Sequence, residues 1–209
     1  MILTPIPPER LGEALNRFAA QLDEPEARAA FARIRRTSPD RAERAAAERD
    51  RQQALELAQR LGVPAHPPGT HPAFNWDGRA LDTDTQAYVI LHEIAHFVLA
   101  PPERRSLIDF GLGPGPDTRD RATAERAAVL PLGEREADEA EASLLGILWE
   151  AALGQPALAS FLDQNWLEGL EGSAAAHFTA VLRQLRRRGV IDAALHAAAE
   201  AQSPARVMR

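Results

Sequence analysis

The sequence contains no cysteine and no lysine among its 209 residues. Without cysteine the chain can form no disulfide bond, no iron–sulfur cluster, no cysteine-ligated zinc site and no thiol nucleophile. Without lysine it has neither a Schiff-base lysine nor the phosphate-binding lysine of a P-loop. All 24 basic residues are therefore arginine. Several common classes of catalytic site are excluded by these two absences.

The chain also lacks an excess of positive charge and a long apolar run. Its net charge of −6 does not support nucleic-acid binding. The longest apolar stretch, residues 87–100, is interrupted by histidine and glutamate and is too short and too polar to span a bilayer. The N-terminus has neither the basic segment nor the apolar segment of a signal peptide. We therefore expect a soluble, cytoplasmic protein.

The apolar stretch contains the motif His92-Glu93-Ile94-Ala95-His96. On a helix, two histidines four residues apart stand on the same face, so both imidazoles can reach one metal ion. Glu93 can then contact a metal-bound water. The expected helix, residues 84–100, is apolar on nearly all sides and should be buried. Buried histidines need partners, which a metal ion supplies or, alternatively, backbone carbonyl groups.

The expected fold is mainly α, with a small β-hairpin or sheet beside the buried H-E-x-x-H helix. Residues 1–62 are expected to form an N-terminal helical extension, and residues 63–209 the metal-binding catalytic domain. Residues 74–81, with an Asp-Gly turn, give the best hairpin candidate. Residues 111–132, rich in glycine, proline and charge, should form a long loop or lid. Helical patterns cover residues 8–36, 40–62, 84–100, 133–153 and parts of 158–202.

A two-histidine site needs a third protein ligand, and the helix at residues 133–153 offers carboxylates. At about 100° per residue, Glu134, Asp138 and Glu141 fall on the stripe that leucines bury further along the helix. Glu136 and Glu139 fall on the other side and should be solvated. The histidines elsewhere in the chain are further candidates: His66, His71, His177 and His196.

The segment Glu134-Arg-Glu-Ala-Asp138 resembles the E-x-x-A-D pattern of gluzincin-type zinc peptidases. By this resemblance Glu134 is the third ligand. Asp138, one turn later, would accept the free ring N–H of one histidine and fix its tautomer. The alternative is a solvated acidic helix start, which the helix dipole favours.

The residues after the motif are more specific than the motif itself. Arg104-Arg105 is followed by Leu107-Ile-Asp109-Phe-Gly, and then by Pro-Asp-Thr-Arg-Asp at residues 116–120. With H-E-I-x-H before them, these segments resemble the elongation factor P hydroxylase family, which has the same runs at the same spacing. Glu134 and Glu141 then match two downstream glutamates of that family. The resemblance covers roughly residues 85–156.

This resemblance implies hydroxylation of a modified lysine side chain on elongation factor P. It implies one divalent metal ion, with iron favoured over zinc. The ion would be held by two histidines and a carboxylate and would keep positions open for oxygen chemistry. The ligands would be His92, His96 and Glu134. Glu93, Arg104, Arg105 and Asp109 are carried over as motif residues, and Asp138 and Glu141 with the arginines and Asp109 would contact the ligands or the substrate. Glu93 is the candidate catalytic residue, but its task is clear in a peptidase and not in a hydroxylase. An arginine of the pair could brace the site through Asp109 or Asp117.

One departure from the family concerns the substrate. The family has an aromatic cluster directly after Asp-Phe-Gly, whereas this chain has Leu112-Gly-Pro-Gly115. Those aromatic side chains could line the substrate pocket, so the identity of the substrate stays open even where the metal ligands match.

Two other functions fit the motif. In a zinc metallopeptidase, Glu93 would take a proton from zinc-bound water during peptide hydrolysis, and Tyr88, His177 or an arginine would stabilise the oxyanion. Generic zinc peptidases do not share the Asp-Phe-Gly and Pro-Asp-x-Arg-Asp segments. A structural metal site in an adaptor is the third possibility, but structural sites are normally closed by four ligands.

Overall fold

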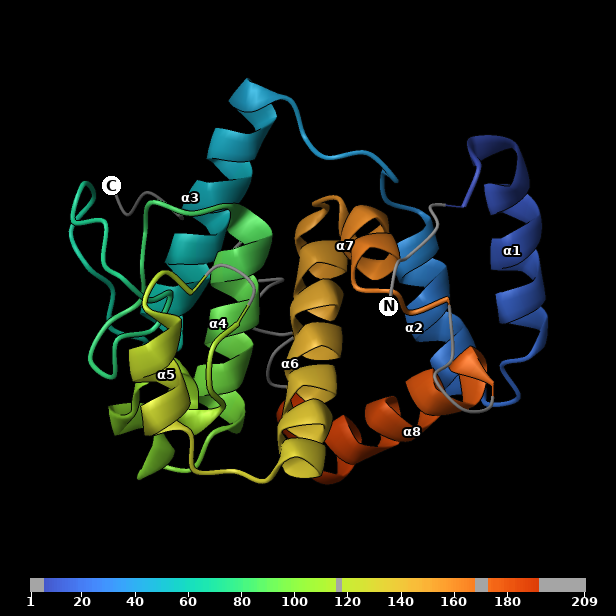
Figure 1. Cartoon of the computed structure of the whole chain (residues 1–209). Coiled ribbons are helices and arrows are strands. Elements are labelled where there is room, and N and C mark those ends of the chain that lie inside the picture. The colour runs from blue at the N-terminus through green and yellow to red at the C-terminus, as the bar shows by residue number, and fades with distance from the viewer. Residues whose placement is uncertain (1–5, 116–117, 168–172, 192–209) are drawn as a thin grey trace, which may run out of the picture.

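The computed structural model describes residues 6–115, 118–167 and 173–191 (Figure 1). Eight α-helices and two short 3₁₀ helices account for the regular structure of these residues, which confirms a mainly helical fold. The α-helices are α1 (Pro8–Ala20), α2 (Pro25–Arg35), α3 (Arg44–Arg60), α4 (Ala87–Leu99), α5 (Arg121–Ala127), α6 (Leu132–Leu153), α7 (Ala157–Asp163) and α8 (Ala174–Arg187). The 3₁₀ helices are η1 (Arg104–Ser106) and η2 (Ile108–Gly111).

The expected β-hairpin is wrong. Within the described residues no strand forms, and the segment makes only isolated bridges, from Leu81 to Trp76 and to Ala65. The Asp77 carboxylate accepts hydrogen bonds from the backbone N–H groups of Arg79 and Ala80, both at 2.9 Å. The turn is thus closed by a side chain. The Leu81 N–H bonds to a third segment, at Pro64. Pairing is therefore shared between two neighbours and does not extend into a ladder.

Two helix predictions also need correction. The pattern over residues 8–36 is two helices, because Pro25 lacks the N–H that a continuous helix would need and instead starts α2. The expected loop at residues 111–132 contains α5, whose first turn is capped by the Asp120 carboxylate. The end of α6 at Gly154, in a left-handed conformation, is as expected. The helix expected at 191–202 lies, beyond its first residue, outside the described residues.

Helices α4 and α6 form the centre of the fold. They pack along each other, with α3 on the far side of α4 and with α2, α7 and α8 against α6 (Figure 1). A Cβ atom at Gly146 of α6 would lie only 3.4 Å from the Cα atom of His92, so the two backbones approach closely there. Asp138 lies beside His96, and Gly146, two turns later, beside His92. The two helices therefore run antiparallel.

One hydrophobic core extends from α1 to α8. Its most aromatic part, here called the aromatic cluster, is formed by α1, α2, α7 and α8 and by Trp166 after α7, with neighbouring rings 4.7–6.5 Å apart. The aromatic cluster consists of Phe18, Phe31, Phe161, Phe178 and Trp166. Helices from residues 1–62 thus share a core with helices from residues 63–209; the division into an extension and a catalytic domain stays a prediction. No helix of the described part is long and apolar enough to cross a membrane.

Candidate metal centre

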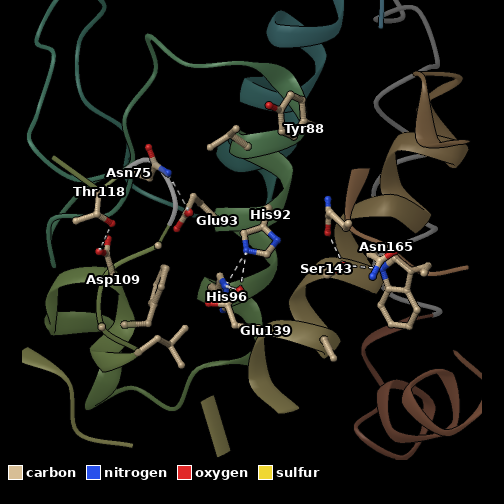
Figure 2. Close-up of a pocket in the computed structure, with 18 of the residues that line it drawn as sticks. Asn75, Tyr88, His92, Glu93, His96, Asp109, Thr118, Glu139, Ser143 and Asn165 are labelled. Atoms are coloured by element: carbon tan, nitrogen blue, oxygen red, sulfur yellow. Dashed lines mark hydrogen bonds and ion pairs between the residues drawn. The ribbon is translucent and has the colours of Figure 1, made fainter. Parts of the chain in front are cut away.

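His92 and His96 of α4 and Glu139 of α6 bring three possible ligand atoms together (Figure 2). The Nε2 atoms of the two histidines are 3.0 Å apart, and the Glu139 carboxylate is 3.3 Å from one and 3.5 Å from the other. All three donor atoms lie within 4.8 Å of one another. Two imidazole nitrogens and a carboxylate oxygen at this separation form a donor set that a single divalent ion can bind.

The third member of this group differs from the expectation. Glu134, expected as the ligand, lies exposed in the first turn of α6 and is not part of the group. Glu139, expected to be solvated on the opposite side, has a side chain 48% exposed with its carboxylate against both histidines. The expected stripe joined Glu134, Asp138 and Glu141 to the leucines further along α6, but the second half of α6 is buried on nearly all sides. Burial of those leucines therefore did not identify the side that faces α4.

A different residue of α6 marks that side. Gly146 lies close to the His92 backbone, and a Cβ atom there would already be in van der Waals contact with it, so little room is left for a longer side chain. Seven residues span two turns, so Glu139 falls within about 20° of Gly146 on the helix, whereas Glu134 falls about 120° away. A glycine inside the helix was thus the available signal for the carboxylate that lies beside both histidines.

Asp138 and Arg104 support the ring of His96. The Arg104 guanidinium donates to the Asp138 carboxylate at 2.9 Å, and the other carboxylate oxygen lies 3.6 Å from His96 Nδ1. His96 Nδ1 and this oxygen are both buried and have no other hydrogen-bond partner among the described atoms. A closer approach would form one bond between them. That bond would place the proton on Nδ1 and leave Nε2 free to bind a metal.

The charges of this centre depend on one another. Burial disfavours a protonated His96, but the Glu139 and Asp138 carboxylates outweigh it and raise the pKa of His96 to about 10. Burial also opposes ionisation of Glu139, yet the two histidines hold the pKa of Glu139 well below its usual value. Without a metal ion, the carboxylates therefore stabilise a protonated histidine. A metal ion would replace that proton, so its affinity should rise with pH.

Glu93 lies beside the three donor atoms but is not one of them. Its side chain is buried, and its carboxylate lies 3.5 Å from the amide nitrogen of Asn75. Burial raises the pKa of Glu93, opposed by the nearby His96 and His92. A buried carboxyl group with a raised pKa, in reach of the same cavity, has the properties of a proton acceptor or donor.

The segment Asp109-Phe110-Gly111 forms a left-handed turn, with φ values of 44°, 53° and 73°. Asp109 accepts a hydrogen bond from Thr118, and burial, together with the charge of Glu93, raises its pKa to about 7. A Cβ atom at Gly111 would lie 2.7 Å from Val129, so a larger residue does not fit. This strained turn directs the Asp109 carboxylate toward the cavity.

The turn also packs Phe110 against the centre. Its ring stacks on Trp76 with centroids 5.0 Å apart and on His96 with centroids 5.5 Å apart. The Trp76 indole N–H in turn donates to the Arg105 carbonyl at 2.9 Å. The Asp-Phe-Gly turn therefore fixes one face of a candidate ligand through stacked rings.

The remaining predicted site residues have structural contacts. Arg105 donates to the Ala100 carbonyl, and its guanidinium lies over the Phe97 ring. Arg188 connects the Glu141 carboxylate to the Leu99 carbonyl at the end of α4. The expected pairing of an arginine with Asp109 does not occur, because Arg104 binds Asp138; Asp117 and His196 lie outside the described residues.

The candidate ligands line a cavity of about 620 Å³. Figure 2 shows Glu93 and Asp109 on one flank, with Asn75 and Thr118, and Ser143 and Asn165 on the other. The segment that follows Asp-Phe-Gly, where this chain differs from the family, also lines the cavity through Leu112, Gly113 and Gly115. The segment that lacks the expected aromatic residues is therefore part of the cavity wall.

Residues 82–131, about a quarter of the chain, match the family model described as elongation factor P hydroxylase. This match confirms the resemblance predicted from the sequence motifs. Both histidines, Glu93 and the Asp-Phe-Gly turn lie inside the matched segment, and Glu139 lies beyond its end. Comparisons with curated proteins and with solved structures gave no significant match.

Proposed function

We propose that the protein is a metal-dependent hydroxylase that acts in the cytoplasm on a modified lysine side chain of a translation factor such as elongation factor P. The observation that carries the proposal is the convergence of His92, His96 and Glu139 at a cavity whose α4 side matches the hydroxylase family. Glu139 takes the ligand role that the sequence had suggested for Glu134. Two histidines and one carboxylate are the donor set of non-haem iron oxygenases, so iron is the proposed ion.

The iron ion, when bound, would supply the activation of dioxygen that hydroxylation requires. The residues of the chain hold and orient the site. Asp138, held by Arg104, lies 3.6 Å from His96 Nδ1. With the small approach that a hydrogen bond needs, it would accept from Nδ1 and leave Nε2 free for the ion. Phe110 stacks on the same ring and limits its rotation. A histidine fixed by both contacts keeps its ligand atom in place when the other positions of the ion change.

The cavity suits a long cationic side chain. Its volume of about 620 Å³ lies in the usual range for small-ligand pockets. Glu93 and Asp109 lie on one flank, and burial raises the pKa of both. An ammonium group that enters the cavity would favour their ionised forms and be attracted by them. Ser143 and the Asn165 amide on the other flank offer neutral hydrogen-bonding groups. A modified lysine that carries an amine would have partners on both flanks.

A zinc metallopeptidase is the second candidate, and the position of Glu93 favours it. A buried glutamate with a raised pKa beside the two histidines is what proton abstraction from zinc-bound water needs. Hydroxylation assigns no such proton transfer to Glu93. The variant Glu93→Gln, which keeps the shape of the side chain, therefore separates the two: it abolishes peptidase activity and leaves a substantial part of hydroxylase activity.

The experiment uses protein purified without oxygen and analysed for bound metal. It is then incubated with oxygen, elongation factor P that carries its modified lysine, and a two-electron reductant, which is needed to reduce the second oxygen atom to water. We expect near-stoichiometric iron and a mass gain of one oxygen atom on the factor. Both should be lost in His96→Ala and Glu139→Ala and retained in Glu134→Ala. Bound zinc with peptide cleavage that Glu93→Gln abolishes would establish the peptidase instead, and wild-type protein that binds no metal would refute both functions.

A further inference from the structure

Arg41 connects a segment near the N-terminus to the wall of the cavity. It lies between α2 and α3, well outside the segment that matches the hydroxylase family. Its guanidinium donates to the hydroxyl of Ser160 at 2.8 Å and to the carboxylate of Asp163 at 2.5 Å, both on α7. The guanidinium carbon also lies 3.8 Å from the centroid of the Tyr88 ring on α4. One side chain thus contacts α7 and α4 together.

The backbone around Arg41 is fixed as well. The Leu158 N–H donates to the Thr37 hydroxyl at 2.8 Å, and the Ala159 N–H donates to the Ser38 carbonyl at 3.2 Å. Residues 37–41 therefore run along the start of α7. With this support, only 34% of the Arg41 side chain is exposed. A surface arginine that merely interacts with solvent would have neither the backbone contacts nor a fixed aromatic partner.

Tyr88 belongs to the cavity. It lines the same space as the candidate ligands and precedes His92 by one helical turn, about 6 Å along the axis (Figure 2). A guanidinium over an aromatic ring attracts the ring face electrostatically and so restricts its orientation. The phenol of Tyr88 can both donate and accept a hydrogen bond. Arg41, from the N-terminal part of the chain, is thus one of the residues that fix the direction of this ring.

We propose that Arg41 is a positioning residue that orients Tyr88 toward the substrate, so that the segment between α2 and α3 completes the cavity. The proposal rests on the proposed function only in that a substrate enters this cavity. It deepens that function by assigning part of the substrate site to residues outside the segment shared with the hydroxylase family.

Tyr88 is the single tyrosine in the sequence, and this makes the proposal directly measurable. Protein labelled with 3-fluorotyrosine has one ¹⁹F NMR signal, which reports the surroundings of this ring alone. Arg41→Met should move the signal, and Arg41→Lys should restore part of the shift because it keeps the charge. The matched control is Arg183→Met. This arginine pairs with Glu24, neither residue lines the cavity, and the variant should leave the signal unchanged.

The same labelled protein tests the connection with the metal centre. Paramagnetic cobalt(II) should shift the wild-type signal relative to zinc(II), and Arg41→Met should change that shift. With modified elongation factor P as substrate, Arg41→Met should raise KM by about tenfold and change kcat much less. Each variant is first checked by circular dichroism and thermal unfolding, and Arg41→Lys replaces Arg41→Met if the latter does not fold.

The outcomes separate the two proposals. An unmoved ¹⁹F signal in a folded Arg41 variant would overturn the positioning role, whatever the activity. A moved signal with unchanged KM and kcat would do the same, because Tyr88 would then not contact the substrate. If the wild-type protein shows no hydroxylation at all, the proposed function fails, whereas the cobalt-dependent shift still decides whether Arg41 orients Tyr88 near the centre.

Discussion

On the side of α6 that faces α7 and α8, the interior consists of stacked and tilted rings, whereas on the side that faces α4 it holds histidines, carboxylates and arginines. The aromatic cluster contains no charged side chain, so its burial stabilises the fold without a desolvation penalty. The α4 side buries His96, Arg104 and Glu93, each of which is costly to remove from water. Apolar packing thus dominates on one side of the helix and buried charge on the other. Two residues connect the sides: Trp166 of the aromatic cluster also lines the cavity, and Glu150 is buried near Ser160 of α7.

The comparison indicates that apolar burial in the aromatic cluster can offset the free-energy cost of burying charged groups at the metal centre. At the metal centre, several contacts fix the position of the His96 ring. Asp138 lies beside one of its nitrogens, Phe110 stacks on its face, and Arg104 holds Asp138. Such contacts contribute little net stability when they bury charge, but they fix geometry. The two sides of α6 should therefore respond differently to mutation.

The largest effect on stability is expected in the aromatic cluster. Phe161 is fully buried and contacts four other rings, so Phe161→Ala should lower the free energy of unfolding by about 3–5 kcal/mol. Denaturant unfolding of metal-free protein measures this value. Metal affinity, titrated below the unfolding midpoint, should stay within about twofold of wild type. A parallel loss of metal affinity would show that the two sides are not independent.

The next effect separates two glutamates on one helix. Glu139→Ala should weaken metal binding by more than about 100-fold, the upper limit for loss of a group that only supports a ligand. Glu134→Ala, the matched control in the first turn of α6, should leave the affinity unchanged. Competition with a chromophoric chelator measures both. A loss of affinity in Glu134→Ala with unchanged affinity in Glu139→Ala would instead favour the ligand that the gluzincin-like pattern suggested.

The difference between these glutamates shows what the sequence can and cannot predict. The spacing of His92 and His96 is a property of one helix, so the motif alone places both rings on one face. The third ligand depends on how α6 rotates and slides against α4, which is a property of tertiary packing. The stripe of carboxylates and leucines along α6 suggested that Glu134 faces α4. The close approach of Gly146 to His92 shows a different rotation of α6 about its axis.

The same reasoning applies to the rest of the fold. Helices were predictable from apolar spacing, and the ends of α4 and α6 follow from proline and glycine. The absence of a hairpin could not be predicted. The Asp77 carboxylate closes the turn, and Leu81 bonds to a segment outside the expected hairpin. Nor could Arg41 be assigned to the cavity, since its contacts with Tyr88 and α7 join residues that are far apart in the chain.

A smaller effect is expected from the contact that orients His96. Asp138→Asn keeps the size of the side chain but removes the negative charge that faces His96 Nδ1 and Arg104. Metal affinity should fall by about 10–100-fold. Glu136→Gln, an exposed neutralisation two residues earlier, is the control for a general loss of negative charge. The same chelator competition measures both, and an unchanged affinity in Asp138→Asn would remove Asp138 from the metal site.

The last effect is a pH dependence that arises in the apolar half of α6. Glu150 is buried there, and burial raises its pKa to about 8 despite the opposing Ser160 hydroxyl and Arg41. An unfolded chain returns Glu150 to its ordinary pKa, 4.5. Between these two values the folded protein holds a proton that the unfolded chain releases. The contribution is thus complete below about pH 4.5 and lost as the pH rises to about 8.

The neutral variant Glu150→Gln should not show this loss. Its stability relative to wild type should be near zero at pH 5 and should increase steadily to about pH 8, then level off. Asp109, whose pKa is raised to about 7, contributes in the same direction in metal-free protein, but it is present in both proteins and cancels in the difference. Denaturant midpoints measured across this range test the prediction. A stability difference between the two proteins that does not change with pH would mean that Glu150 is ionised in the folded state and paired with Arg41. Buried charge would then be present in the apolar half of α6 as well as beside α4.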